Sequence, residues 1–569
     1  MLRIALCQSN LPVGDIDGNV ERLRERIDAA QKKGAELVIF PELSLSGYPP
    51  EDLLLKPSFV ERSRAAVHEL ATDIHDLVVL VGCPYPDGDL YNAAAVLANG
   101  KVVTIYRKHY LPNYAVFDEQ RYFTSGDQAI VIDINGNRVG LTICEDIWHS
   151  GGPAQWEAID GEAQLIVNLS ASPYHRTKGL ERERMFATRC IDYKCFFAFC
   201  NAIGGQDELV FDGHSVVVDP NGEVIARGQQ FKEELVVVDL DLASAFRSRL
   251  HDPRWQQRFS NAGGHVETIN VSSPNFEKPS LKYCKPQSLL EPEEEVYRAL
   301  VLCTTDYAKK NDFHHAILGL SGGIDSALSL AVATDALGAK AVTAVSMPSR
   351  YTSDANREDA KEQADRLGVN FLEIPIYDLV ESYTDALAEP FANTKPNVSE
   401  ENLQARIRGN IVMALSNKFN WLVLTTGNKS EMSVGYATLY GDMAGGFSVL
   451  KDVLKTWVYR LAKWRNRDSE IILQKIIQKA PSAELRENQL DTDTLPTYDV
   501  LDVILEAYVE QDRTPAEIEE LGFDSTLVKQ VVEMIDRSEY KRRQAPPGIR
   551  ISTKAFGKDR RLPITNHYR

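Results

Sequence analysis

The sequence predicts an α/β protein of two domains, in which a strand-rich domain is followed by a doubly wound, mainly parallel sheet. Two observations predict this. A chain of 569 residues is longer than one hydrophobic core usually organises. Short apolar segments alternate with amphipathic helical segments along both halves, as in α/β proteins. The alternation is lost near residues 246–290, so we expect domains at 1–245 and 291–569 with an ordered linker between them.

The first domain opens with a strand expected at 4–6, a helix at 20–33 and a second strand at 36–40. Further strands are expected at 77–82, 93–97, 102–106, 139–143 and 165–168. Asn135-Gly136 and Pro220-Asn221-Gly222 are hairpin-type turns, so part of this sheet is expected to be antiparallel.

The second domain repeats a strand–helix unit. Strands are expected at 316–320, 341–347, 370–376 and 421–425, and helices at 296–310, 356–367 and 401–418. Helical crossovers between successive strands predict a parallel sheet, which binds ligands at the carboxyl ends of its strands.

Composition excludes several classes of protein. The net charge of −18 argues against a nucleic-acid partner. Apolar runs are shorter than a membrane span, and residues 1–4 enter a strand rather than a signal peptide. The eight cysteines (Cys7, Cys83, Cys144, Cys190, Cys195, Cys200, Cys284 and Cys303) contain no C-x-x-C pair and are expected to be reduced. We therefore expect a cytoplasmic enzyme that acts on small molecules, with no nucleic-acid or membrane partner.

Three reactive side chains come directly after predicted strands: Glu42, Lys108 and Cys144. A cysteine nucleophile needs a base that takes its proton and a cation or N–H donors that stabilise the oxyanion. Glu42 as base, Lys108 as electrostatic partner and Cys144 as nucleophile would hydrolyse an amide through a thioester. Each residue taken singly is more often structural, so the prediction depends on the surrounding motifs.

A glycine-rich turn, Gly319-Leu320-Ser321-Gly322-Gly323-Ile324-Asp325-Ser326, lies between a predicted strand and a predicted helix. Backbone N–H groups at such a turn converge on phosphate. The turn matches neither a Walker A loop nor G-x-G-x-x-G. Its Ser-Gly-Gly-x-Asp-Ser pattern resembles the phosphate loop of ATP pyrophosphatases, which split ATP into AMP and pyrophosphate. Mg²⁺ is expected to neutralise the phosphates, with Asp325 and Glu431 as its ligands.

The three strand-end residues lie in extended motifs. These are Pro41-Glu42-Leu43-Ser44-Leu45-Ser46-Gly47-Tyr48, Tyr106-Arg107-Lys108-His109-Tyr110-Leu111-Pro112 and Ile143-Cys144-Glu145-Asp146-Ile147-Trp148. Together they resemble the nitrilase (carbon–nitrogen hydrolase) superfamily over about residues 1–245. The resemblance implies a four-layer α-β-β-α sandwich with a Glu-Lys-Cys triad. It also implies a glutamine pocket formed by Tyr114, Glu119, Ser170 and Arg176, with Glu119 as a second glutamate near the triad.

Motifs of the second half follow a different family. They are Asn402-Leu403-Gln404-Ala405-Arg406-Ile407-Arg408, Thr425-Thr426-Gly427-Asn428-Lys429-Ser430-Glu431, Tyr440-Gly441-Asp442-Met443-Ala444-Gly445-Gly446-Phe447, Arg543-Gln544-Ala545-Pro546-Pro547-Gly548 and Lys554-Ala555-Phe556-Gly557-Lys558-Asp559-Arg560-Arg561. They resemble the synthetase domain of NAD synthetases, which implies an adenine nucleotide alpha hydrolase-like fold. A nitrilase-type domain ahead of it is the signature of the glutamine-dependent members.

This resemblance implies the reaction and the remaining site residues. ATP adenylates the nicotinate carboxylate of deamido-NAD and releases pyrophosphate, and ammonia from glutamine then displaces AMP to give NAD. The family roles place Asn402, Arg406, Glu431 and Lys554 near deamido-NAD, Thr426 at ATP, and Lys455 at phosphate. Leu439 stands where ammonia-only relatives often have lysine, which weakens the roles taken from them. A homo-oligomer is expected.

Three other functions would account for part of the sequence. A papain-like Cys–His site would use His109 or His149, but the Glu-Lys-Cys motifs explain more residues. A different ATP pyrophosphatase, such as an RNA-thiolating ligase, would need a basic surface and usually further cysteines, and Cys303 is the single cysteine after residue 291. A nucleotide-binding regulator with a degenerate hydrolase domain would not require both motifs to be intact.

Overall fold

The structure is a computed structural model that describes residues 1–253, 255, 262–271, 278–281 and 285–567. The chain divides into two compact units. The first comprises Met1–Gln206 and Val210–Leu290, and the second comprises Asp207–Leu209 and Glu291–Arg569. Each unit has its own sheets and hydrophobic core.

One sheet of the first unit has six strands: β1 (Leu2–Gln8), β2 (Leu37–Ile39), β3 (Val78–Asp87), β4 (Asp89–Ala98), β5 (Lys101–Arg107) and β14 (Glu234–Leu240). Their order is β14-β1-β2-β3-β4-β5. β1, β2 and β3 are parallel, whereas β14, β4 and β5 add antiparallel pairs. The strands that precede Glu42 and Lys108 therefore belong to one sheet.

A second sheet has seven strands: β6 (Ala129–Ile134), β7 (Asn137–Ile143), β8 (Leu165–Ser170), β9 (Phe196–Asn201), β12 (Val216–Val218), β13 (Val224–Arg227) and β15 (Val266–Val271). Their order is β13-β12-β9-β8-β7-β6-β15. The two expected hairpins are confirmed, since β6 pairs antiparallel with β7 and β12 with β13. The strand that precedes Cys144, β7, is an interior strand of this sheet, between β8 and β6. A separate two-stranded sheet joins β10 (Ile203–Gln206) to β11 (Leu209–Asp212).

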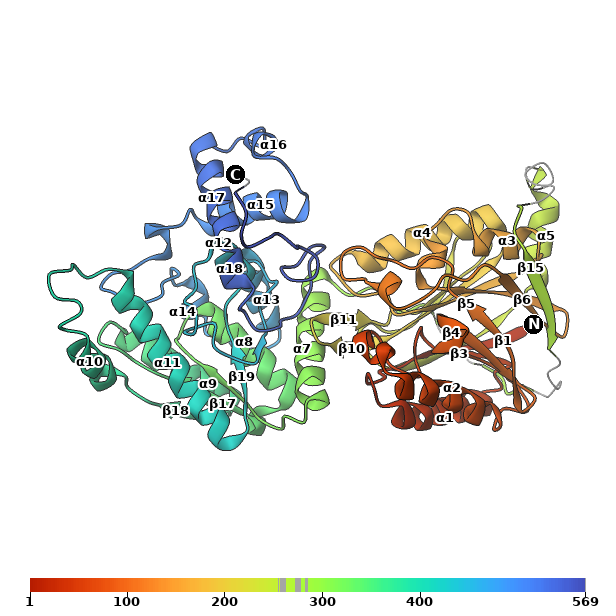
Figure 1. The fold of residues 1–569 in the computed structure, drawn as a ribbon, viewed down its shortest axis with the longest axis horizontal. Coiled ribbons are helices and arrows are strands. Elements are labelled where there is room, and N and C mark those ends of the chain that lie inside the picture. Colours follow the sequence, from red (N-terminus) through yellow and green to blue (C-terminus); the bar gives the residue numbers. More distant parts are fainter. Residues whose placement is uncertain (254, 256–261, 272–277, 282–284, 568–569) are drawn as a thin grey trace. The chain divides into compact units, whose positions relative to one another are not determined.

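Helices cover the outer face of each large sheet. They are α1 (Ile16–Lys32), α2 (Pro57–Ala71), α3 (Pro153–Ile159) and α4 (Lys178–Tyr193), whereas α5 (Ala243–His251) follows β14 and places Ala245 in the core between the two sheets. Side chains alternate along the strands, so Leu2, Ile4 and Leu6 pack between the two sheets while Ala5 and Cys7 pack against α1 and α2. The helices α3 and α4 cover the other sheet (Figure 1). The expected four-layer α-β-β-α sandwich is confirmed.

The segment expected to be a linker, 246–290, contributes a strand. β15 pairs in parallel with β6 from Val266–Ala129 to Val271–Ile134 and extends the seven-stranded sheet. Val266, Ile269 and Val271 of this strand are buried or partly buried, whereas its polar and charged residues are exposed, which suits a strand at the edge of a sheet. The remaining parts of the expected linker lie partly outside the described residues, as does Cys284.

The second unit contains a five-stranded parallel sheet. Its strands are β16 (Ala316–Gly319), β17 (Val342–Ser346), β18 (Asn370–Glu373), β19 (Leu422–Thr425) and β20 (Phe447–Ser448), in the order β18-β17-β16-β19-β20. All four pairings are parallel. The chain order reverses at β16, so the doubly wound sheet that the sequence predicts is confirmed, with the glycine-rich turn at its switch point.

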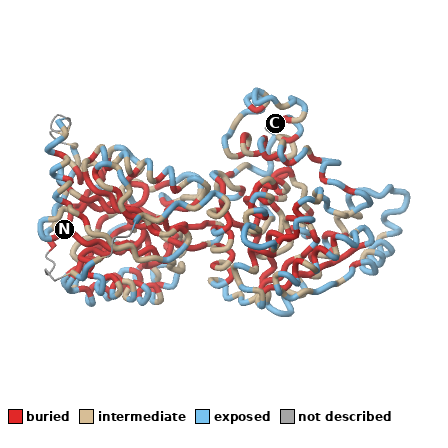
Figure 2. The backbone as a smooth tube through the Cα atoms, turned by 180° about the vertical axis from the view of Figure 1, so that it is seen from behind, coloured by how far each residue is buried: buried red, intermediate tan, exposed pale blue. Residues whose placement is uncertain are grey.

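Helices surround this sheet and form a further cluster after it. They are α7 (Pro292–Lys310), α8 (Ile324–Leu337), α9 (Asp354–Leu367), α10 (Tyr377–Ala386), α11 (Val398–Phe419), α12 (Lys429–Val434), α13 (Lys455–Arg465), α14 (Gln474–Gln478), α15 (Tyr498–Leu505), α16 (Pro515–Glu519), α17 (Ser525–Arg537) and α18 (Glu539–Arg542). Figure 2 shows that each unit has a buried interior and that exposed residues follow its outer segments. None of the helices in the described part of the chain has the length and apolar character needed to cross a bilayer.

Candidate functional site

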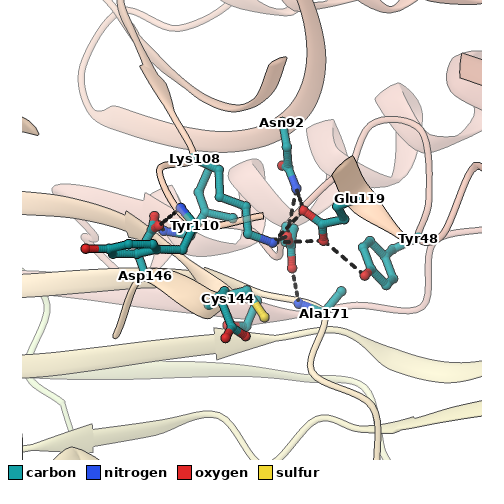
Figure 3. Close-up of polar contacts among 12 residues, drawn as sticks. Tyr48, Asn92, Lys108, Tyr110, Glu119, Cys144, Asp146 and Ala171 are labelled. Atoms are coloured by element: carbon teal, nitrogen blue, oxygen red, sulfur yellow. Dashed lines mark hydrogen bonds and ion pairs between the residues drawn. The ribbon is translucent and has the colours of Figure 1, made fainter. Parts of the chain in front are cut away.

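Lys108 follows β5 directly, and its ammonium binds two carboxylates. Its Nζ lies 2.6 Å from Oε1 of Glu42 and 2.8 Å from both carboxylate oxygens of Glu119 (Figure 3). Lys108 is 0% exposed and both acids are buried. Burial lowers the pKa of Lys108, but the two carboxylates outweigh burial and hold this pKa well above its usual value. The lysine is therefore charged in the resting site.

Three groups fix the Glu42 carboxylate. Its Oε1 accepts hydrogen bonds from Lys108 and, at 2.8 Å, from the side-chain amide of Asn92, while its Oε2 accepts the backbone N–H of Ala171 at 3.0 Å. Asn92 also donates to Glu119 at 3.3 Å. A carboxylate held this way keeps one orientation, which a general base requires.

The backbone at Glu42 packs tightly on Gly82 of β3. The carbonyl oxygen of Gly82 accepts the N–H of Leu45 at 3.0 Å. A Cβ at Gly82 would overlap the backbone of Pro41 and Leu43, on either side of the base. Glycine is required here because the two chain segments touch through their backbones.

Glu119 is the second acid of the cluster. Its Oε1 accepts the hydroxyl of Tyr48 at 3.2 Å in addition to the lysine. Burial raises the pKa of Glu119, Lys108 lowers it and Glu42 raises it, which leaves it at about 7. A protonated Glu119 leaves Glu42 and Lys108 as one balanced ion pair.

Cys144 begins a short 3-10 helix, η3 (Cys144–Ile147), directly after β7. Its backbone has φ of 41°, in the left-handed region that a non-glycine residue rarely adopts. Burial and the Glu42 charge raise the pKa of the Cys144 thiol, and Lys108 lowers it, with the balance well above the usual value. The resting thiol is therefore protonated, and attack on a substrate needs a base.

Of the four residues expected to hold glutamine, Glu119 belongs to this cluster. The other three are near it in the sequence, and one of them contacts the residue next to Cys144. The Tyr114 hydroxyl donates to Oε2 of Glu145 at 2.9 Å, so it reaches the residue next to Cys144. Ser170 ends β8, is buried, and donates to Asn168 at 2.7 Å. Arg176 is half-buried in the segment after β8.

Sequence reasoning missed three residues of this site: Tyr48, Asn92 and Glu145. Asn92 offered a signal, since it is a polar residue within a buried apolar strand. Buried polar side chains are usually hydrogen-bonded to something specific. Glu145 and Tyr48 lie within the motifs around Cys144 and Glu42, but nothing in the sequence sets them apart from the other residues of those motifs.

Both histidines of the papain-like alternative have other contacts. His109 Nδ1 lies 3.1 Å from the hydroxyl of Tyr106, and the ring of His149 stacks on Tyr110 at 3.8 Å. Besides burial, the groups that most affect the pKa of Cys144 are Glu42 and Lys108. The arrangement favours the Glu-Lys-Cys reading.

The glycine-rich turn of the second unit connects β16 to α8. Ser326 closes it, because its Oγ accepts the N–H of Ser321 at 3.3 Å and donates to the carbonyl of Gly323 at 2.9 Å. Gly322 has φ of 81°, and a Cβ there would overlap the carbonyl oxygen of Asn356. These contacts fix the conformation of the turn at the start of α8, where the free N–H groups of a helix N-terminus favour an anion.

Asp325 and Glu431 converge on one cation, the ammonium of Lys455. Lys455 Nζ lies 2.5 Å from Asp325 and 3.0 Å from Glu431. Asn428, which caps α12, donates to the other oxygen of Asp325 at 2.8 Å. Burial raises the pKa of Glu431, Lys455 lowers it and Asp325 raises it, giving about 7. Among the described residues, no group of three or more His, Cys, Asp and Glu side chains is arranged to hold a metal.

A cavity of about 1000 Å³ lies over the carboxyl ends of the parallel strands. Most of the expected ATP and deamido-NAD residues line it: Gly319, Leu320, Ser321, Gly323, Ile324, Asp325, Ser326, Asn402, Thr426, Glu431 and Lys455. Gly322, Arg406 and Lys554 are outside this lining. Arg406 donates to the carbonyl of Leu439 at 3.2 Å, and Lys554 pairs with Asp512 at 2.5 Å.

Known proteins resemble both units and the whole chain. Residues 3–249 match the family Carbon-nitrogen hydrolase, and residues 296–545 match NAD synthase. The "Glutamine-dependent NAD(+) synthetase" of Thermotoga maritima is 49% identical, with 100% of this chain and 99% of the relative covered. Its namesake from Aquifex aeolicus is 47% identical with 100% of both covered. A solved structure of glutamine-dependent NAD+ synthetase from Acinetobacter baumannii is 41% identical, has a TM-score of 0.76, and is matched over 99% of this chain and 98% of its own. This chain belongs to the family of glutamine-dependent NAD(+) synthetases.

Proposed function

We propose that the chain amidates deamido-NAD to NAD with a glutaminase site in its first unit and an ATP-dependent ligase site in its second. The family supplies the overall reaction, a ligation in which glutamine donates the amide nitrogen. The observation that carries the assignment of residues is the buried cluster of Glu42, Lys108 and Glu119 beside Cys144, in a chain whose other unit holds an open phosphate loop.

The glutaminase step starts with a protonated thiol. Glu42 takes the proton of Cys144, and the thiolate sulfur attacks the side-chain amide carbon of glutamine. The carbonyl oxygen becomes an oxyanion, which the Lys108 ammonium stabilises. The C–N bond then breaks, the proton on Glu42 passes to the leaving nitrogen, and ammonia and a thioester result. Glu42 next accepts a proton from water, and the water oxygen attacks the thioester carbon. The C–S bond then breaks to release glutamate, and the proton on Glu42 returns to the sulfur and restores the thiol.

Four side chains are proposed to hold glutamine for this step. Arg176 can bind the α-carboxylate through its planar fork, and Ser170 can bind the α-amino group. Glu145 offers a buried carboxylate to the same ammonium, and Tyr114, hydrogen-bonded to Glu145, closes that side. Glu119 acts through Lys108 rather than on the amino acid itself.

The second site is proposed to hold ATP on the glycine-rich turn, with Thr426 at the end of β19 beside it. The relative from Acinetobacter baumannii was solved in complex with adenosine diphosphate, which supports a nucleotide in this fold. Mg²⁺ is proposed to neutralise the phosphates. Asp325 and Glu431 fit it, because both already turn their oxygens to one cation, and Mg²⁺ commonly uses only one or two carboxylates along with phosphates. Lys455 then lies free to meet phosphate.

Deamido-NAD is proposed to occupy the rest of the cavity. Asn402 lines it and accepts the hydroxyl of Thr438 at 2.7 Å, which orients its amide. Arg406 and Lys554 keep their proposed contacts with the dinucleotide, although each now binds another group. Their roles therefore need a rearrangement of the side chains on substrate binding.

The assembly and compartment are also proposals. Leu379 and Tyr383 on α10 are each 43% exposed, and exposed apolar side chains of this kind support an assembly of several copies. Light scattering measures the number of copies in solution. The seven cysteines within the described residues are free thiols, which fits a reducing cytoplasm.

Purified protein supplied with ATP, Mg²⁺, glutamine and deamido-NAD is expected to produce NAD, AMP and pyrophosphate in equal amounts. Formation of ADP instead would reject the pyrophosphatase assignment. Cys144→Ala is expected to abolish synthesis from glutamine and to retain it with high ammonium, while Cys83→Ala, a buried cysteine on β3, retains both. Equal loss with both nitrogen donors would count against two separate sites.

A further inference from the structure

We propose that Asp146 is a positioning residue, which locks the turn bearing Cys144 to the segment bearing Lys108. The proposal rests on the proposed function, because it assumes that these two residues act together on glutamine. Asp146 is 0% exposed and lies two positions after Cys144. It acts through the nucleophile and the cation rather than on the substrate.

The two oxygens of Asp146 accept four hydrogen bonds. Oδ1 accepts the backbone N–H groups of His109 at 3.1 Å and Tyr110 at 2.9 Å. Oδ2 accepts the backbone N–H of Ile143 at 2.9 Å and the hydroxyl of Tyr106 at 2.7 Å. Figure 3 shows Asp146 and Tyr110 beside Lys108 and Cys144. One carboxylate thus contacts both strand ends of the site, which belong to different sheets.

The donors bracket the catalytic residues along the chain. Tyr106 lies two positions before Lys108, and His109 and Tyr110 follow it, so the lysine is held on both sides. Ile143 immediately precedes Cys144, so the fourth bond fixes the entrance to its turn. Asp146 and Ile143 form the capped start of η3, the element that Cys144 opens.

Cys144 needs such support because its backbone is in the left-handed region, with φ of 41°. A non-glycine residue remains there only when its surroundings hold it. Release of Ile143 would let the turn relax and shift the sulfur relative to Lys108. Catalytic groups tolerate little displacement, since a shift of about 1 Å lowers rates by about 100-fold.

A carboxylate suits this position better than an amide. An ionised carboxylate accepts at about four lone-pair sites and donates at none. Asparagine has one accepting oxygen, so its NH₂ group would face two donors at either orientation. Asp146→Asn therefore preserves the size of the side chain but loses about half of its four hydrogen bonds. Tyr106→Phe is a milder variant, since it removes one of the four bonds.

The test measures kcat and KM for glutamine, together with synthesis from ammonium, in both variants. Asp146→Asn is expected to lower the glutamine-dependent kcat by about 100-fold with KM within about 3-fold, because the glutamine contacts are made by other residues. Synthesis from ammonium should stay within about 2-fold of the wild type. Tyr106→Phe should lower the same kcat by a smaller factor. Asp73→Asn, an exposed aspartate paired with Arg24 at 3.0 Å, is the matched control and should change nothing.

Unchanged glutamine-dependent kcat, a rise in KM alone, or equal loss with both nitrogen donors in Asp146→Asn would overturn the proposal. If that variant does not fold, Tyr106→Phe decides: a lower kcat at constant KM supports the positioning role, and an unaltered kcat refutes it. Failure of the proposed function is recognised separately, because Cys144→Ala would then still use glutamine.

Discussion

Replacing Lys108 with methionine removes the cation that binds Glu42 and Glu119 while it keeps most of the side-chain volume. Each contact, at 2.6 to 2.8 Å, has a gross Coulomb energy of about 6 kcal/mol at an effective dielectric constant of about 20. The variant also escapes the cost of burying the ammonium. Breaking a fully buried pair therefore lowers the free energy of unfolding by about 3–5 kcal/mol at pH 8.

The same variant should depend on pH. Without Lys108, burial and the Glu42 charge raise the pKa of Glu119 further above its unfolded value, so stability is lost as pH rises through the folded pKa. The deficit relative to the wild type should consequently shrink at pH 5.5. Hydrogen exchange of β5 peptides in increasing urea reports the unfolding free energy of this unit. Lys101→Met, an exposed lysine at the start of the same strand, is the control and should change it by less than about 0.5 kcal/mol.

Activity provides a second readout. Loss of the oxyanion's cation should lower glutamine-dependent turnover by about 100- to 1000-fold and leave ammonium-dependent synthesis intact. The reasoning is refuted if the Lys108→Met deficit at pH 8 is below about 1 kcal/mol, or if it is the same at pH 5.5. Substantial turnover with glutamine would refute the catalytic role even if stability falls as expected.

Three further predictions concern single residues. Glu119→Gln should flatten the dependence of stability on pH between pH 4.5 and about 7. The folded pKa of Glu119, raised to about 7, stabilises the protein below pH 4.5, and this stabilisation is lost as pH rises. Thermal unfolding at several pH values measures the dependence, and a curve unaltered by the substitution would contradict the prediction. Gly322→Ala should raise KM for ATP at least about 10-fold, since its Cβ overlaps the Asn356 carbonyl, whereas an unchanged KM would show that the loop can move. Lys455→Met should reduce pyrophosphate release about 100-fold with either nitrogen donor, because it removes the cation between Asp325 and Glu431 and leaves the two carboxylates to repel each other. A loss of activity confined to glutamine would disprove this.

Much of the fold was predictable because its signals are local. Strands such as β1 and β5 and the helix α1 appear as apolar periodicity, and the reactive side chains of the first unit come shortly after the ends of strands. The parallel sheet of the second unit follows from its helical crossovers. β15 was missed because its pairing with β6 joins residues about 137 positions apart, and nothing local records that partner.

The supporting residues of the candidate sites were less accessible to sequence reasoning. Asn92 touches Glu42 across 50 positions and Asp325 touches Lys455 across 130. The first contact depends on how the strands of one sheet are arranged and the second on how the helices α8 and α13 pack, and neither depends on local propensity. Arg406 and Lys554 illustrate the converse, because a family motif proposes their ligand while this structure shows other contacts for both.

The close approach at Gly82 limits how this protein can be recombined with its relatives. β3 supplies no side chain to the cluster of Glu42, Lys108 and Glu119, yet its backbone packs directly against the chain at Glu42. A chimaera that takes residues 37–46 from one parent and 78–82 from another would combine two backbones that were not fitted to each other. Crossover points for such libraries should therefore fall outside both segments, so that the two segments come from the same parent.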